Sequence, residues 1–176
     1  MLLYFGIAAA VLTAAWVAWN LTLDALWQPT DMRTVQQMLE LAEVKENEHV
    51  VDLGCGDGRF LIAASRQFNA RATGIEIDPA RVLWARISIF FAGLRRSRPQ
   101  VIWGDMYKAD LRAADVVILF LSAKANFRLG DRLRSQLGKS ARVVSYYHEM
   151  WGWRPARVTW TKAGHPIYLY RMAVEQ

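Results

Sequence analysis

Apolar positions divide the chain into one long unbroken segment followed by short runs whose period alternates. Residues 1–23 contain no charged side chain, and Asp24 ends this segment. Beyond it, short β-branched runs typical of buried strands alternate with runs in which apolar residues recur every three or four positions, as in helices. This alternation predicts an α/β fold built on a mainly parallel, twisted sheet.

The expected strands and helices follow one another closely. Two alternating runs near the C-terminus surround a turn with Gly164 and predict an antiparallel hairpin. An apolar stripe of Leu83, Ile87, Phe90 and Leu94 predicts a helix that begins after Asp78-Pro79. The predicted strands lie at residues 49–53, 70–77, 100–103, 115–121, 141–147, 157–162 and 167–174, and the other predicted helices at 60–68 and 123–137.

The uncharged segment 1–23 is long enough to cross a bilayer, since about 20 apolar residues suffice. Trp16, Trp19 and Trp27 gather toward its C-terminal end, as aromatic residues do at a membrane interface. No basic residue precedes the apolar run, which argues against a cleaved signal peptide. We therefore expect a transmembrane helix that anchors the protein in the lipid bilayer, with a buried or partner-binding helix as the alternative.

Three parts are expected along the chain: an anchor at 1–23, a connector with one helix at 24–46, and a ligand-binding domain at 47–176. The first basic residue, Arg33, follows the anchor. This charge bias places the domain on the cytoplasmic or matrix-equivalent side of a single-pass protein.

Residues 50–59 read V-V-D-L-G-C-G-D-G-R, which predicts a strand, a glycine turn and the start of a helix. The glycines allow backbone conformations that a Cβ forbids and let a ligand approach the main chain. A pyrophosphate prefers a helix N-terminus without carboxylates. Asp52 and Asp57 flank this turn, so a ligand with cationic groups such as S-adenosylmethionine fits better than a dinucleotide.

Glu76 ends the second predicted strand, 22 residues after Gly54. An acidic residue about 20 positions after such a turn typically accepts hydrogen bonds from ribose hydroxyls. The alternative is an ordinary carboxylate at a strand end. The G-x-G-x-G spacing also differs from that of NAD-binding turns, which disfavours an oxidoreductase.

The formal net charge of +6 arises in the second half of the chain. Such a basic surface suits nucleic acid, anionic lipid or acidic protein, and the charge does not choose among them. A single cysteine, Cys55, provides neither a disulfide framework nor a zinc site, so we expect no metal and a reducing compartment.

Together, D-L-G-C-G-D-G at 52–58, Glu76 and Gly104-Asp105 resemble the class I S-adenosylmethionine-dependent methyltransferases. The resemblance implies their Rossmann-like fold and S-adenosyl-L-methionine as cofactor, with Asp105 pairing with adenine. The cofactor-binding residues that it implies are Asp52, Gly54, Cys55, Gly56, Asp57, Gly58, Glu76, Ile77, Asp105, Met106 and Phe120.

A narrower resemblance rests on Pro29-Thr30, A-D-V-V at 114–117, Asn126, and residues 145–155. These look like the ATP synthase c-subunit lysine methyltransferase family. The resemblance implies a protein-lysine N-methyltransferase that acts on a membrane-associated protein, with Pro29, Thr30 and Asn126 on the substrate side. Ser122-Ala123 replaces the Leu-Pro of that family, and Tyr146 replaces a His.

Polar candidates for catalysis stand after the fifth predicted strand: Tyr146, His148 and Glu149, whose alternative interpretation is aromatic packing and a solvated acid. Two other functions stay open. One is a small-molecule or lipid methyltransferase, and the other is a non-catalytic S-adenosylmethionine-binding membrane protein. We expect no nucleic-acid partner.

Overall fold

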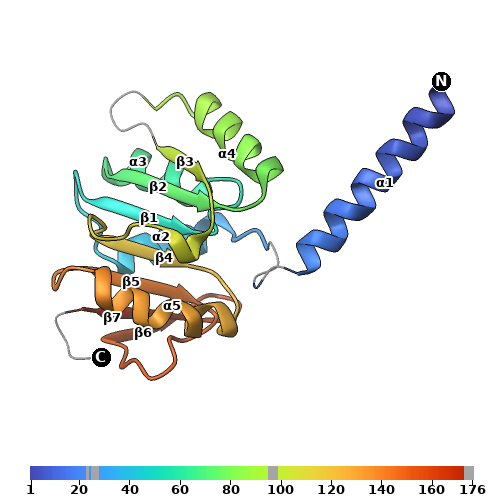
Figure 1. The fold of residues 1–176 in the computed structure, drawn as a ribbon. Coiled ribbons are helices and arrows are strands. Elements are labelled where there is room, and N and C mark those ends of the chain that lie inside the picture. The colour runs from blue at the N-terminus through green and yellow to red at the C-terminus, as the bar shows by residue number, and fades with distance from the viewer. Residues whose placement is uncertain (23, 25–27, 95–98, 173–176) are drawn as a thin grey trace.

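A computed structural model describes residues 1–22, 24, 28–94 and 99–172 of the chain. A seven-stranded sheet with the strand order β3-β2-β1-β4-β5-β7-β6 forms its centre (Figure 1). The first five strands are parallel, and β7 runs antiparallel to both β5 and β6. The strands are β1 (His49–Leu53), β2 (Arg71–Glu76), β3 (Gln100–Trp103), β4 (Val116–Leu119), β5 (Arg142–Tyr146), β6 (Arg157–Trp160) and β7 (Pro166–Arg171).

The predicted mainly parallel sheet and its C-terminal antiparallel hairpin are thus confirmed. The strands begin and end close to their predicted limits, although the predicted end of the last strand at 174 lies outside the described residues. The helices are α1 (Leu2–Leu21), α2 (Met32–Leu41), α3 (Arg59–Phe68), α4 (Pro79–Phe91), α5 (Ala123–Gln136) and the short 3-10 helix η1 (Met106–Lys108).

Apolar side chains cover both faces of the sheet. Val50 of β1 belongs to the core under α2, α3 and α4, whereas its neighbour Val51 belongs to the core under α5. This is the alternation that a strand imposes, and it makes the central strands apolar at nearly every position. Leu129 and Leu133 of α5 are fully buried, and each contributes about 1.5–3 kcal/mol to folding.

The helix ends follow the local signals in the sequence. Asp31 caps α2 by accepting hydrogen bonds from the backbone N–H groups of Arg33 and Thr34. Asp78 caps α4 in the same way through Ala80, and Asn69 ends α3 in the left-handed conformation. Such caps satisfy backbone groups that the helix itself leaves unpaired.

The prediction of a transmembrane helix over residues 1–23 is wrong. A helix does form, as α1, but no helix in the described part of the chain combines the length and the apolar character needed to cross a bilayer. Near its C-terminal end, Trp16 and Asn20 form hydrogen bonds with residues of the sheet domain. Leu23 and Trp27 lie outside the described residues.

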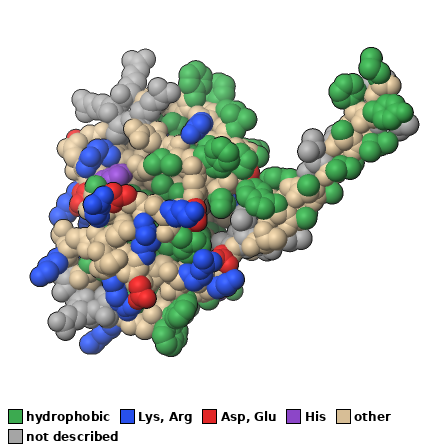
Figure 2. All heavy atoms as spheres, in the orientation of Figure 1, with side chains coloured by type: hydrophobic (Ala, Val, Ile, Leu, Met, Phe, Trp, Pro, Cys, Tyr) green, Lys and Arg blue, Asp and Glu red, His purple; other side chains and the backbone are tan. Residues whose placement is uncertain are grey.

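Helix α4 forms where it was predicted, but a different face of it packs against the sheet. Val82, Ala85 and Ile89 are buried, whereas Leu83 and Phe90 of the predicted apolar stripe are exposed. Figure 2 shows hydrophobic side chains gathered at the end of the domain from which α1 projects. On the buried face, the small side chain of Ala85 lies so close to Gly58 that a Cβ on the glycine would be 3.3 Å from the Cβ of Ala85, so α4 packs tightly against the glycine turn.

Candidate functional site

A cavity of about 500 Å³ lies at the carboxyl ends of β1, β2 and β4, where ligands bind in open α/β sheets. Its volume is within the roughly 300–1,000 Å³ of small-molecule sites. Most of the predicted cofactor residues and two of the predicted substrate-side residues line it: Asp52, Gly54, Cys55, Gly56, Asp57, Glu76, Ile77, Asp105, Met106, Phe120, Pro29 and Thr30.

The turn after β1 depends on glycines. Gly54, Gly56 and Gly58 have φ angles of 84°, 53° and 80°, which residues with a Cβ rarely adopt. A Cβ at Gly58 would lie 3.3 Å from the Cβ of Ala85, so this glycine also allows α4 to pack against the turn. Gly58 therefore lies on the side of the turn that faces α4. It is not among the described residues that line the cavity.

Glu76 lies at the end of β2 and is held by backbone groups. Its Oε2 accepts a hydrogen bond from the N–H of Gly56 at 2.9 Å, and its Oε1 accepts one from the N–H of Asp78 at 2.9 Å. Each carboxylate oxygen has a second lone pair that can still accept a hydroxyl. The side chain is therefore oriented in advance for a ligand with neighbouring hydroxyls, such as a ribose.

Asp52 is buried beside Glu76 at the base of the cavity. Burial, together with the nearby carboxylates of Glu76 and Asp57, raises the pKa of Asp52 to about 8. Carboxyl groups crowded together in this way disfavour an anionic ligand and favour one that brings a positive group, which would stabilise their ionised forms. Burial likewise raises the pKa of the Cys55 thiol far above its usual value, so this residue is a neutral lining group and no nucleophile.

Arg59 joins the connector before α2 to the glycine turn. Its guanidinium forms an ion pair with Asp57 and donates a hydrogen bond to the carbonyl of Thr30. The Arg59 guanidinium lowers the pKa of Asp57 against the opposing effect of burial. This contact brings Pro29 and Thr30 to the cavity, where the family resemblance expects the substrate side.

A cluster around Asp24 forms another wall of the cavity, and sequence reasoning missed it. Lys124 Nζ lies 2.8 Å from Asp24 Oδ1, Arg128 forms an ion pair with Oδ2, and the Tyr107 hydroxyl donates to Oδ2 at 2.9 Å. The guanidinium of Arg128 also lies 4.0 Å from the centre of the Tyr107 ring. The partners are 83 to 104 residues apart in the chain, so only the fold brings them together.

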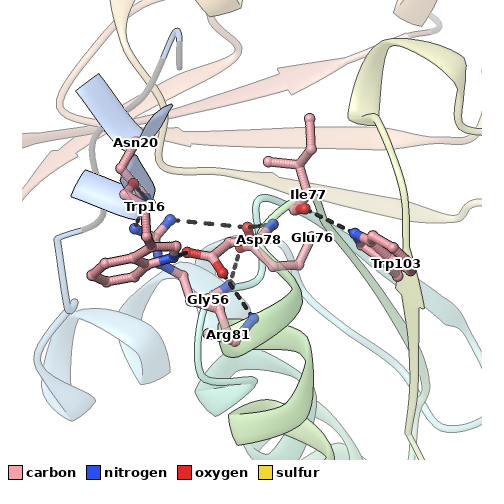
Figure 3. Close-up of polar contacts among 9 residues, drawn as sticks. Trp16, Asn20, Gly56, Glu76, Ile77, Asp78, Arg81 and Trp103 are labelled. Carbon is pink, nitrogen blue, oxygen red and sulfur yellow. Dashed lines mark hydrogen bonds and ion pairs between the residues drawn. The ribbon is translucent and has the colours of Figure 1, made fainter. Parts of the chain in front are cut away.

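The end of α1 reaches the same site from the other side (Figure 3). Trp16 Nε1 donates to Asp78 Oδ2 at 3.1 Å, and Arg81 donates to Asn20 Oδ1 at 2.5 Å. Arg81 also forms two ion pairs. Its Nη1 lies 3.9 Å from Glu76 Oε1, and its Nε lies 3.5 Å from Asp78 Oδ2. Helix α1 is therefore linked to the acid that is expected to bind the ribose.

The remaining predicted residues lie away from this cavity. Asn126 is fully buried and braces the loop after β5 by donating to the carbonyls of His148 and Glu149. Tyr146 is buried with its ring 4.6 Å from that of Phe120, while His148 and Glu149 line a different pocket. Within the described residues, the structure thus brings none of the three catalytic candidates to the cavity surface.

Comparison with known proteins agrees with this geometry. The sequence model of the ANTKMT methyltransferase domain matches residues 52–157, more than half of the chain. This chain belongs to that family. It is an S-adenosylmethionine-dependent methyltransferase, as its glycine turn and strand-end acids indicated.

Three relatives of this methyltransferase show how far the similarity extends. A protein-lysine N-methyltransferase of Saccharolobus islandicus is 38% identical over 146 residues, which cover 81% of this chain and 90% of the relative. The ATP synthase c-subunit lysine N-methyltransferase of Homo sapiens is 26% identical over 74% of this chain, which spans about half (55%) of that relative. The family resemblance seen in the sequence is therefore confirmed.

The third relative is a solved structure. The crystal structure of an RNA methyltransferase from Salinibacter ruber in complex with S-adenosyl-L-homocysteine has a TM-score of 0.80 and 38% identity. The match covers 85% of this chain and 96% of that one.

The cavity of this methyltransferase suits S-adenosylmethionine. The cofactor carries a methyl group on a sulfonium sulfur, together with an ammonium and a ribose. Glu76 has free lone pairs for two ribose hydroxyls, and the buried carboxyl of Asp52 suits a cationic group. Asp105 Oδ1 accepts a hydrogen bond from the N–H of Tyr107, which fixes this carboxylate at the end of β3; its pairing with adenine stays a prediction.

Proposed function

We propose that this methyltransferase methylates the side-chain nitrogen of lysine residues in a protein. The observation that carries the proposal is the 38% identity to the S. islandicus protein-lysine N-methyltransferase, over 90% of that relative's length. Similarity that extends over almost the whole relative supports a common class of acceptor as well as a common fold.

The surroundings of the cavity support a lysine acceptor on physical grounds. A lysine side chain with a pKa of about 10.4 is protonated at neutral pH and must lose its proton before it attacks a methyl group. Apolar side chains of Pro29, Phe60 and Phe120 line the cavity. Apolar surroundings next to a positive sulfonium lower the pKa of an amine. The protein then contributes mainly by holding the nitrogen in line with the methyl group.

RNA is the second candidate acceptor. The S. ruber protein is named as an RNA methyltransferase and is also 38% identical to this chain. Basic side chains are spread over the face of the domain seen in Figure 2, in keeping with the net charge of +6. Lipids and small molecules are the other acceptors that the sequence left open.

The test uses the purified protein and S-adenosylmethionine with a radiolabelled methyl group. It is incubated separately with soluble protein, membranes and total RNA from the source cells, at a limiting cofactor concentration, with Glu76→Ala as the control of weakened cofactor binding. Label in lysine residues, confirmed by mass spectrometry, supports the proposal. Label in RNA, lipid or small molecules alone overturns it. Comparison of the membrane and soluble fractions tests the membrane-associated substrate, which stays a prediction, as does the cytoplasmic placement.

A further inference from the structure

A second pocket, of about 530 Å³, lies beside the start of α5. Three of its aromatic side chains are well exposed: Phe127 at 60%, Tyr147 at 47% and Trp151 at 71%. Phe127 and Trp151 meet edge to face, with ring centres 5.6 Å apart. The pocket is lined by Ala123, Phe127, Tyr147, His148, Glu149, Trp151 and Tyr168.

Buried side chains hold the loop at residues 147–151, which lines part of this pocket. Asn126 donates to the carbonyls of His148 at 3.0 Å and Glu149 at 3.3 Å, and the buried Tyr170 hydroxyl accepts from the N–H of Met150 at 2.9 Å. Tyr147 has a φ of 71°, a conformation that is strained for an aromatic residue. Strain of this kind persists where the surrounding structure over-determines it, typically at binding sites.

The charge of the pocket selects among ligands. Glu149 is exposed, and its carboxylate forms no hydrogen bond or ion pair with any residue that the structure describes. Aromatic faces attract cations, and a carboxylate beside them adds to this attraction. The same carboxylate repels phosphate groups. The pocket therefore suits a positively charged group on an apolar stem.

The second pocket and the cofactor cavity are lined by residues of the same two turns of α5. Lys124 and Arg128 of α5 line the cofactor cavity, whereas Ala123 and Phe127, one position earlier in each turn, line the second pocket. Residues four apart on a helix share a face, so the two pockets occupy neighbouring faces of the same two turns. A peptide with one residue in the cavity can place a nearby residue in the second pocket.

We propose that the aromatic pocket around Glu149 binds a basic side chain, lysine or arginine, of the substrate protein next to the lysine that is methylated. This inference rests on the proposed lysine methylation and adds a specificity site to it. Glu149 and Trp151 are the residues that select the substrate, through charge and through the aromatic face.

The first experiment measures binding without catalysis. Pentalysine and a neutral pentaglutamine are titrated into the protein saturated with S-adenosylhomocysteine. Pentalysine is expected to bind more tightly, and Glu149→Gln and Trp151→Ala are each expected to weaken it roughly fivefold. Asp131→Asn and Trp160→Ala, which change exposed residues outside the pocket, serve as matched controls and are expected to leave binding unchanged.

The second experiment compares two lysine peptides that carry either arginine or glutamine beside the target. For the arginine peptide, Glu149→Gln is expected to raise KM with little change in kcat, and for the glutamine peptide to change neither. Equal kinetics of variant and parent on both peptides would overturn the proposal even if lysine methylation is confirmed. Pentalysine binding that depends on Glu149 in a protein that methylates no lysine would instead reject only the proposed function.

A third arm uses a single-stranded oligonucleotide. If Trp151→Ala weakens binding of the oligonucleotide but leaves pentalysine binding unchanged, the aromatic residues serve base stacking. That result would overturn the proposal.

Discussion

The indole of Trp16 donates a hydrogen bond to Asp78 Oδ2 at 3.1 Å, although the two residues are 62 positions apart. Asp78 in turn donates its backbone N–H to Glu76, so the two contacts connect the last turns of α1 with the acid expected to hold the ribose. Figure 3 shows this chain of contacts. An N-terminal helix is thereby coupled to the cofactor site.

This coupling predicts that Trp16→Phe weakens cofactor binding, although Trp16 does not line the cavity. Loss of the N–H donor removes one of the hydrogen bonds that join α1 to the domain and loosens the turn that positions Glu76, so the dissociation constant is expected to rise roughly fivefold. Isothermal titration calorimetry with S-adenosylhomocysteine measures the change. Trp19→Phe is the control, because its indole forms no hydrogen bond among the described residues; equal effects of both variants would contradict the coupling.

Glu76→Ala is expected to reduce cofactor affinity at least about tenfold, since hydrogen bonds to a charged group contribute roughly 1.5–3 kcal/mol. The loss should appear in calorimetry with S-adenosylmethionine and with S-adenosylhomocysteine alike, because both contain the ribose. Circular dichroism checks that the variant is folded. An intact variant that binds with unchanged affinity would show that the ribose lies elsewhere.

Asp52 predicts a pH dependence of stability in the protein without cofactor. Its pKa is about 8 in the folded chain against 3.8 as the ordinary value, so between these limits the folded state holds a proton that the unfolded state has lost. The contribution of the Asp52 carboxyl to the free energy of unfolding is therefore fully present below about pH 4, and it falls as the pH rises toward 8. Urea unfolding of the parent and of Asp52→Asn measures the difference, and the variant should lack this component.

The same carboxyl predicts proton release on cofactor binding. If a cationic group of the cofactor lies beside Asp52, cofactor binding favours the ionised carboxylate of Asp52. Binding then releases up to about one proton at pH 7. Calorimetry in two buffers with different ionisation enthalpies counts the protons. Asp52→Asn should abolish the release, and a parent protein that releases none would place the cationic group away from Asp52.

Gly74→Ala is expected to lower the free energy of unfolding by about 1–3 kcal/mol, as overpacking does in a closed core. A Cβ at this position of β2 would lie 2.5 Å from Cys55 Sγ and 2.7 Å from Leu61 Cδ1. Gly138→Ala provides the matched control, because a Cβ there meets no atom of the described residues within 4 Å. Chemical denaturation compares the two, and equal stability would mean that the strand yields without cost.

The sequence by itself determined the elements that depend on local chemistry. Short β-branched runs define the central strands, since such residues suit a sheet buried on both faces. Gly54, Gly56 and Gly58 identify the turn, because positive φ angles exclude most other residues. Glu76 could be found by counting from that turn, since the length of one helix and one strand sets the spacing.

Only the tertiary structure decided which surfaces meet. The large apolar stripe of α4 predicted a buried face, yet the buried face carries Val82, Ala85 and Ile89, and Ala85 lies close to Gly58 of the glycine turn. The uncharged N-terminal run predicted a bilayer span, yet Trp16 and Asn20 bind Asp78 and Arg81. Asp24 with Lys124 and Arg128 forms no local pattern. Contacts between residues 61 to 104 positions apart leave no periodicity in the chain, so they exist only once the sheet has brought its strand ends together.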